Sequence, residues 1–217
     1  MKVDIRLYGI VGGSGHNDPA ALAAAAVRGG ATLIQYRDKH ASTRQMIDTA
    51  TALKSALARF GAPLLINDRV DVALAAGADG VHLGQEDMPV EIARRLLGPD
   101  AIIGLTIKND LHVTQAPMDA IDYAAVGGVF VTTSKDNPDP PVGLSGLARL
   151  AVGLKARRGD LPVCAIAGID EANASQVIEA GAGGVSVISA LFAGAETEAR
   201  AQRLRRIVDE ALNEERT

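Results

Sequence analysis

The chain has 217 residues, 47% of them hydrophobic and 22% charged, which is typical of a globular protein with a large core and excludes a disordered chain. The formal net charge is −4 at pH 7 and no basic block is present, so we expect no nucleic-acid partner. No apolar run approaches the roughly 18 residues of a membrane helix, so no membrane insertion is expected. Because Lys2, Asp4 and Arg6 stand where a signal peptide needs an apolar run, a cytoplasmic location is predicted.

Short β-rich runs recur along the chain, each followed by an amphipathic segment. The predicted strands are residues 4–11, 32–36, 64–67, 80–83, 101–105, 123–126, 163–166 and 184–188. Helical patterns cover residues 20–27, 45–59, 70–76, 90–97, 144–157, 171–180 and 196–214, and residues 110–118 carry only a poor helical pattern. Strands that alternate with helices predict crossover connections and a parallel sheet.

A repeat supports this count of strands. Segments that begin at Gly30, Gly77 and Gly181 share one pattern of helix end, glycine, short turn and strand. Their spacing corresponds to roughly 25 residues per β/α unit. We therefore predict a single (β/α)8 barrel (TIM barrel) domain over residues 1–217, with a doubly wound open sheet as the alternative.

The only cysteine, Cys164, lies in a predicted strand and cannot form an internal disulfide. A buried, inert thiol in a reducing compartment is favoured over a catalytic thiol. In a barrel of this type the chemistry lies at the carboxyl ends of the strands, so the candidate site residues are sought there.

Polar residues alternate along the second predicted strand and beyond its end. Gln35, Arg37 and Lys39 share one face, whereas Ile34 and Tyr36 face the helices. Two cations and an amide suit an anion with several oxygens, because arginine forms bidentate bonds and lysine adds a point charge. A solvated charge cluster is the simpler alternative. An imine-forming Lys39 is a third interpretation, which the adjacent arginine makes less suitable than a phosphate ligand.

Two aspartates, Asp68 and Asp87, follow the third and fourth strands where helices begin. Each could simply cap its helix. Because consecutive strands of a barrel are neighbours, the two carboxylates can instead face one pocket and hold Mg²⁺ together with phosphate oxygens. His82 also faces inward, but it lacks a second histidine at ligand spacing and is predicted to be a core residue with satisfied hydrogen bonds.

The last three strands are followed by candidate phosphate ligands. The longest irregular stretch, residues 127–142, contains Thr132, Thr133, Ser134 and Lys135 together with three prolines. Such a loop is predicted to form a semi-rigid lid, with an ordinary surface loop as the alternative. After the seventh and eighth strands, Gly168 and the Ile188–Ser189 pair lead into helical segments, where many barrels bind a phosphate.

These segments together resemble the thiamine-phosphate synthase family, in register from about Tyr8 to Ser189. Residues 35–39 and 67–87 are specific in combination, whereas the glycine segments are common to many phosphate-binding barrels. The resemblance implies a transferase that joins hydroxymethylpyrimidine diphosphate to a thiazole phosphate and releases pyrophosphate and thiamine monophosphate. The implied route is dissociative: the pyrimidine methylene leaves the pyrophosphate as a stabilised cation, and the thiazole nitrogen then attacks it.

The resemblance also implies roles for individual residues. Arg37, Lys39 and Lys135 would act on the leaving pyrophosphate, and Asp68 and Asp87 would hold the cofactor Mg²⁺. The implied ligands of the pyrimidine diphosphate are Gln35, Arg37, Lys39, Asn67 and Lys135, and Tyr36, Asp38 and Thr106 complete the predicted substrate-binding set. The implied ligands of the thiazole phosphate are Thr132, Thr133, Ser134, Gly168, Ile188 and Ser189.

Three departures from the family pattern are visible. Where the family usually reads Gly-Val-Ser-Ala-His, this chain has Gly-Leu-Thr-Ile-Lys, so Thr106 keeps a hydroxyl but Lys108 replaces the histidine. Ala167 stands in a usual Gly-Gly pair, and Val131 replaces a usual proline. The change at Lys108 leaves open which residues contact the pyrimidine there. The changes at Ala167 and Val131 leave open how stiff the phosphate-binding loops are.

Two other functions are considered. A thiazole-phosphate isomerase from a related barrel branch would have no use for the metal and diphosphate residues Arg37, Lys39, Asp68 and Asp87. A non-catalytic sensor of phosphorylated metabolites would have little reason to keep a metal site. The expected partners are small-molecule substrates, and association into a homo-oligomer is left open.

Overall fold

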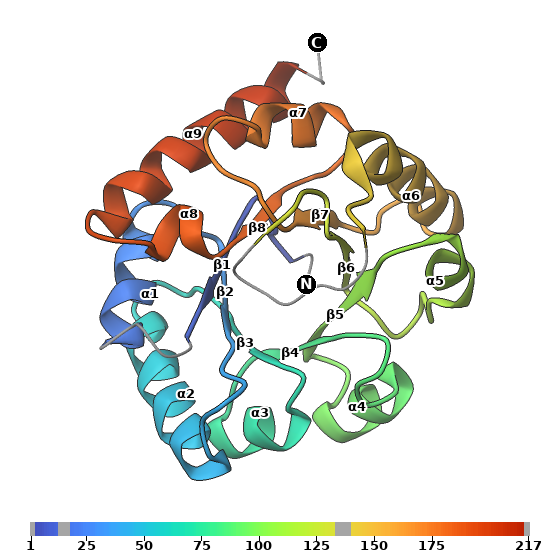
Figure 1. Cartoon of the computed structure of the whole chain (residues 1–217). Coiled ribbons are helices and arrows are strands. Elements are labelled where there is room, and N and C mark those ends of the chain that lie inside the picture. Colours follow the sequence, from blue (N-terminus) through green and yellow to red (C-terminus); the bar gives the residue numbers. More distant parts are fainter. Residues whose placement is uncertain (1–2, 13–17, 133–139, 215–217) are drawn as a thin grey trace.

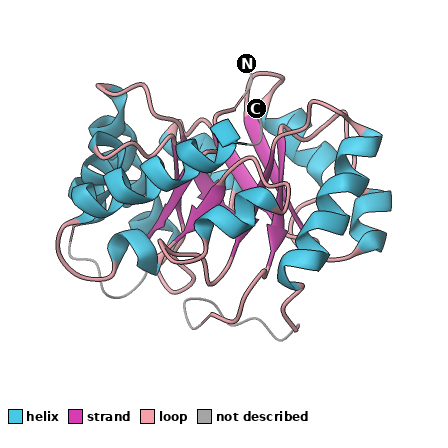
Figure 2. Cartoon of the chain, turned by 90° about the horizontal axis from the view of Figure 1, so that it is seen from above, coloured by secondary structure: helices cyan, strands magenta, loops and turns pink. Residues whose placement is uncertain are grey.

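The computed structural model describes residues 3–12, 18–132 and 140–214. Eight parallel strands form a closed barrel in chain order, and helices surround it (Figure 1), which confirms the predicted (β/α)8 fold. The strands are β1 (Leu7–Val11), β2 (Leu33–Tyr36), β3 (Leu64–Asn67), β4 (Gly80–Leu83), β5 (Ile102–Ile107), β6 (Tyr123–Gly127), β7 (Val163–Ile166) and β8 (Val185–Val187). Figure 2 shows the strands side by side with the helices flanking them.

The helices follow the strands as the sequence pattern predicts. They are α1 (Pro19–Arg28), α2 (Thr43–Ala58), α3 (Val70–Ala76), α4 (Val90–Leu97), α5 (Asp110–Gln115), α6 (Gly143–Arg157), α7 (Ala174–Glu179), α8 (Ser189–Phe192) and α9 (Thr197–Glu214). Helix α2 begins at a capping box in which Ser42 and Gln45 satisfy each other's backbone N–H groups. The weakly patterned stretch after β5 forms the short helix α5, which Asn109 caps through the backbone N–H of His112.

Two strand boundaries differ from the sequence prediction by more than one residue. Strand β1 begins at Leu7 and not at residue 4, because Asp4 folds back to pair with Arg6 at 2.6 Å on the surface. Strand β5 continues to Ile107, beyond the predicted end at residue 105. The longer β5 carries the inward-facing alternation as far as the pocket, where Thr106 and Lys108 lie.

The core has two parts, separated by the barrel wall. Outward-facing strand residues and the inner faces of the helices form the larger part. The smaller part fills the barrel interior, where Tyr8, Leu33, Leu65, Tyr123 and Cys164 are buried. Burial raises the pKa of the Cys164 thiol to about 12, which disfavours the thiolate and fits the prediction of an inert thiol.

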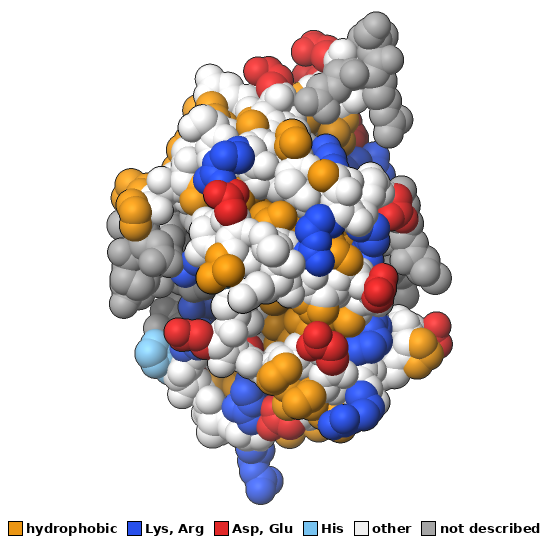
Figure 3. Space-filling model, turned by 90° about the vertical axis from the view of Figure 1, so that its right-hand side faces the viewer, with side chains coloured by type: hydrophobic (Ala, Val, Ile, Leu, Met, Phe, Trp, Pro, Cys, Tyr) orange, Lys and Arg blue, Asp and Glu red, His pale blue; other side chains and the backbone are white. Residues whose placement is uncertain are grey.

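The outer surface is mixed in charge on the face shown in Figure 3, where acidic and basic side chains are interspersed with apolar ones. Among the described residues, no helix is both long and apolar enough to span a bilayer. The feature that positions a site is the end of the barrel at which all eight strands terminate together.

Candidate active site

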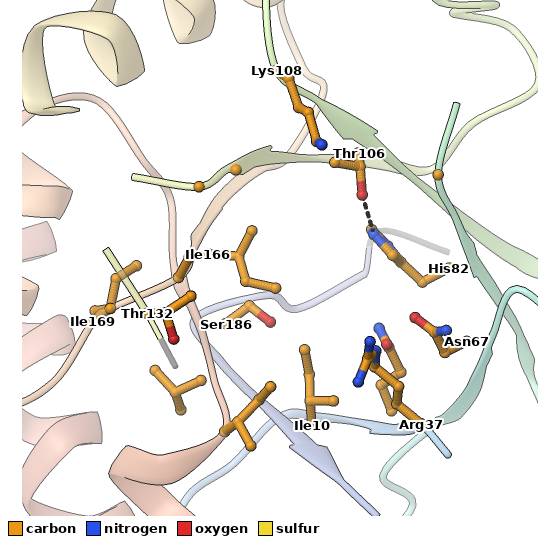
Figure 4. Close-up of a pocket in the computed structure, with 18 of the residues that line it drawn as sticks. Ile10, Arg37, Asn67, His82, Thr106, Lys108, Thr132, Ile166, Ile169 and Ser186 are labelled. Carbon is orange, nitrogen blue, oxygen red and sulfur yellow. Dashed lines mark hydrogen bonds between the residues drawn. The ribbon is translucent and has the colours of Figure 1, made fainter. Parts of the chain in front are cut away.

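A pocket of about 840 Å³ lies at the carboxyl ends of the strands and receives side chains from all eight strands or the loops that follow them (Figure 4). Eleven of the residues predicted from the sequence line it: Gln35, Arg37, Lys39, Asn67, Asp68, Asp87, Thr106, Thr132, Gly168, Ile188 and Ser189. The structure thus brings together predicted residues that lie at or after the ends of seven different strands. Thr133, Ser134 and Lys135 lie outside the described residues, as does the middle of the predicted lid.

The end of β2 supplies two cations and an amide to this pocket. Gln35 is buried and donates a short hydrogen bond from Nε2 to the hydroxyl of Tyr8. The Nε atom of Arg37 is buried with no hydrogen-bond partner among the described residues. The ammonium of Lys39 forms a short ion pair with Asp68. A buried guanidinium N–H without an acceptor among the described residues fits the binding of an anionic ligand.

The other two residues of this segment have structural roles. Tyr36 points away from the pocket and is buried in the outer core. Asp38 accepts hydrogen bonds from the backbone N–H groups of His40 at 2.9 Å and Ala41 at 3.0 Å, which closes the turn before α2. Neither side chain lines the pocket. Strand alternation explains the difference, since only Gln35, Arg37 and Lys39 share the inward face.

The two carboxylates meet between the ends of β3 and β4. Burial acts to raise the pKa of Asp68, but hydrogen bonds with Asp87 and Lys39 outweigh it and lower that pKa. Burial and the neighbouring Asp68 carboxyl raise the pKa of Asp87. Asp87 also accepts a 2.7 Å hydrogen bond from the backbone N–H of Gly84.

Neither aspartate caps a helix. Arg69 and Pro89 hold the cap positions of α3 and α4, and neither of those helices has a side-chain cap hydrogen bond. Asp68 instead has a φ of 62°, in the left-handed region that a residue other than glycine adopts only when its surroundings impose it. Two adjoining carboxylates on neighbouring strands fit Mg²⁺, which is usually bound by one or two carboxylates and completed by phosphate oxygens and water.

A chain of buried hydrogen bonds crosses the barrel interior beneath the pocket. The Tyr8 hydroxyl lies 3.0 Å from that of Tyr123, and the Tyr123 hydroxyl lies 2.8 Å from Nδ1 of His82. The Nε2 atom of His82 is 2.8 Å from Oγ1 of Thr106, as Figure 4 shows. Both nitrogens of His82 are therefore engaged, in agreement with the prediction of a satisfied core residue. This chain fixes the orientation of Thr106 at the pocket.

The opposite wall of the pocket is built by the ends of β6, β7 and β8. Gly168 has a φ of 67°, and a Cβ atom there would lie only 2.6 Å from the carbonyl oxygen of Val131, so a larger residue does not fit. The side chain of Asn173 donates a 2.9 Å hydrogen bond to the Gly168 carbonyl and fixes this turn. Ala167, the departure from the family pattern, has a φ of 86° and is therefore strained.

Several pocket residues are not among the predicted site residues. They are His82, Gln85, Lys108, Asn109, His112 and Ser186. Strand alternation would have found two of them. Lys108 lies two residues after Thr106, just beyond the end of β5, and Ser186 of β8 lies two residues before Ile188. His112 comes from α5, whose weak helical pattern gave no indication of a site. Gln85 donates a 2.6 Å hydrogen bond to the carbonyl of Thr106 and links the ends of β4 and β5.

The family model and the relatives at 36% identity or more described below indicate the same family. The family model described as thiamine monophosphate synthase matches residues 7–191. The chain is 53% identical to the thiamine-phosphate synthase of Agrobacterium fabrum, with 97% of both chains covered. It is 46% identical to the thiamine-phosphate synthase of Chloroflexus aurantiacus, over 95% of this chain and 94% of that one. A solved structure of thiamine phosphate pyrophosphorylase from Pyrococcus furiosus superposes with a TM-score of 0.84 at 36% identity, covering 97% of this chain and 98% of that chain.

Proposed function

The chain belongs to the thiamine monophosphate synthase family, and we propose that it couples hydroxymethylpyrimidine diphosphate to a thiazole phosphate with the help of Mg²⁺. The products are thiamine monophosphate and pyrophosphate. One observation carries the residue roles given below: a single pocket has cations and paired carboxylates on one wall and a glycine-rich turn with hydroxyl groups on the opposite wall. Two phosphorylated substrates can therefore be held face to face.

The wall formed by β2, β3 and β4 would bind the diphosphate. Arg37 would donate its buried Nε–H and its terminal N–H groups to phosphate oxygens, and Lys39 would add a second positive charge. Asn67 lines the same wall and would donate from its side-chain amide. Neutralising the charge that develops on the leaving pyrophosphate is the main catalytic task in a dissociative route.

Asp68 and Asp87 would hold the metal ion on this wall. Bound Mg²⁺ would neutralise charge on the diphosphate oxygens. Lys39 forms an ion pair with Asp68, and the Asp68 carboxyl raises the pKa of the neighbouring Asp87. A divalent cation between the two carboxylates would relieve their repulsion. The protein's own part is to fix both carboxylates beside the phosphates.

The wall formed by β6, β7 and β8 would bind the thiazole phosphate. Its donors would be Thr132, the backbone at Gly168 and the start of α8 at Ser189. Thr133 and Ser134 are proposed for the same phosphate, and Lys135 for the diphosphate. Bond formation requires only that the thiazole nitrogen face the pyrimidine methylene. The thiazole nitrogen is itself the nucleophile, so the protein needs to position the two substrates and supplies no nucleophile of its own. Because the substrates are charged phosphates that do not cross membranes freely, we place this activity in the cytoplasm.

The direct test is incubation of the protein with both substrates and Mg²⁺, with pyrophosphate and thiamine monophosphate measured together. We expect both products in equal amounts, and little pyrophosphate when the thiazole phosphate is left out. Conversion of the thiazole phosphate to an isomer without pyrophosphate would favour the isomerase. Tight binding without turnover would favour the metabolite sensor.

A further inference from the structure

Three polar side chains are buried in the barrel interior and line the floor of the pocket. Gln35 of β2 and Ser186 of β8 are each 1% exposed, and His82 of β4 is 7% exposed. Interiors of this fold are built from layers of side chains contributed by alternate strands, and these three residues all come from even-numbered strands. Most interior neighbours of this layer are apolar. A polar layer at this depth requires a partner for each member, or it destabilises the fold.

Two members of the layer have such partners among the described residues, but the third has none there. Gln35 donates to Tyr8, and His82 contacts Tyr123 and Thr106. The Oγ atom of Ser186 is buried with no hydrogen-bond partner among the described residues. An unpaired buried hydroxyl is costly, so its presence at the wall of a binding pocket indicates a partner that the ligand brings.

The surroundings of Ser186 restrict what that partner can be. Ser186 pairs in register with Tyr8 of β1 and Ile166 of β7, and its hydroxyl points into the cavity (Figure 4). Ile10 and Ile166 line the pocket on either side. The charged groups Arg37, Lys39 and Asp68 follow β2 and β3, on the other side of β1 from β8. A floor that combines these isoleucines with the uncharged polar side chains of Gln35, His82 and Ser186 suits a flat heteroaromatic ring with a nitrogen acceptor, not a phosphate.

We infer that the Ser186 hydroxyl donates a hydrogen bond to a ring nitrogen of the pyrimidine, and so helps the pocket to distinguish the pyrimidine diphosphate from other diphosphates. This inference rests on the proposed function. The thiazole ring is excluded as the acceptor, because its single nitrogen is the nucleophile and must stay free to attack. The pyrimidine nitrogens form no new bond in the reaction. With the diphosphate held at the strand ends, the ring is the part of that substrate that reaches the floor.

The test compares Ser186→Ala with the unaltered protein by calorimetric titration of three ligands in the presence of Mg²⁺: the pyrimidine diphosphate, inorganic pyrophosphate and the thiazole phosphate. Because Ser186→Ala removes one hydrogen bond, its affinity for the pyrimidine diphosphate should fall about three- to tenfold. Pyrophosphate has no ring, so its affinity should be unchanged, and so should that of the thiazole phosphate. Ser186→Cys replaces the hydroxyl by a thiol, which is a weak donor, and should show the same selective loss.

Cys164→Ala is the matched control, because Cys164 is also buried in the barrel interior but does not line the pocket. It should leave all three affinities unchanged. Unchanged affinity of Ser186→Ala and Ser186→Cys for the pyrimidine diphosphate would overturn the inference. An ordered water molecule would then be the expected hydrogen-bond partner of the Ser186 hydroxyl. Equal weakening of all three ligands would overturn it as well, since that pattern indicates a general distortion. Failure of the unaltered protein to bind the pyrimidine diphosphate would instead refute the proposed function.

Discussion

Two lysine–aspartate pairs lie at opposite ends of the same barrel and have different surroundings. At the amino-terminal end, Lys54 of α2 lies 2.5 Å from Asp79, and the same carboxylate accepts the backbone N–H of Leu64 at 2.7 Å. At the pocket end, Lys39 pairs with Asp68, which also interacts with a second carboxylate, Asp87. The first aspartate is satisfied by the protein alone. The second is held in a strained conformation beside a group of like charge.

The amino-terminal arrangement is repeated, which supports a structural role. Asp122 precedes β6, as Asp79 precedes β4, and it accepts the backbone N–H of Ile103 at 2.7 Å and the guanidinium of Arg94 at 2.6 Å. In both cases a carboxylate joins a helix to the start of a strand. Under the proposed function, similar ion pairs at the two ends of the barrel would serve different purposes: stability at one end and ligand binding at the other.

The largest expected effect is on the pocket pair. Asp68→Asn and Asp87→Asn should each lower turnover by about 10²-fold or more and raise the Mg²⁺ concentration needed for activity, because each removes a charged ligand from a hard cation. The melting temperature should change by only a few degrees, since neither side chain caps a helix. Steady-state rates at several Mg²⁺ concentrations give the measurement.

The double variant provides a control for this prediction. Because both carboxylates would serve one ion, its loss should be much smaller than the product of the two single losses. If turnover and Mg²⁺ dependence were unchanged in both single variants, the proposed metal site would be refuted. The contrast between the two ends of the barrel would then have no functional basis.

The next effect is specific to one wall of the pocket. Arg37→Met should lower the affinity for the pyrimidine diphosphate by about tenfold or more, because charge-assisted hydrogen bonds are worth about 1.5–3 kcal/mol each. The thiazole phosphate, assigned to the opposite wall, should bind as before. Titration of each ligand separately measures both affinities. A similar loss for both ligands would show that the walls do not act separately.

The amino-terminal pair should respond in the opposite way to the pocket pair. Asp79→Ala leaves the Leu64 N–H and the Lys54 ammonium without their acceptor and should lower the free energy of unfolding by about 1–3 kcal/mol. The rate of the folded enzyme should be unchanged. Urea denaturation and an assay at low temperature measure the two quantities. Asp79→Asn keeps an acceptor oxygen and should lose less, so an equal loss in both variants would point to charge rather than to the backbone hydrogen bond.

The smallest effect concerns strain at the pocket end. Ala167 has a φ of 86°, which glycine adopts without penalty, so Ala167→Gly should raise the free energy of unfolding by up to about 1 kcal/mol. Its main measurement is the urea midpoint at unchanged slope. A lower midpoint would mean that the added freedom of glycine in the unfolded chain outweighs the strain. The affinity for the thiazole phosphate should show whether the strained turn is needed for binding.

Strand and helix order could be predicted from the sequence because each β/α unit is a local pattern that repeats. The ends of the strands could not be placed as well, since Asp4 and Arg6 are compatible with an extended strand until they pair with each other. The inward positions Gln35, Arg37 and Lys39 followed from alternation, which also predicts that Tyr36 faces outward. The unpaired state of Ser186 has no local signal, because it depends on which groups from β1 and β7 surround it.

The closure of the barrel has a consequence for how the chain is made. Strand β1 pairs with β8, and the last helix, α9, packs against α1 and α7. During synthesis the amino-terminal units leave the ribosome first, so β1 keeps an unpaired edge until nearly the whole chain has emerged. Such an edge can recruit other extended segments. The nascent protein is therefore expected to need shielding, for example by a chaperone, until its final β/α unit is released.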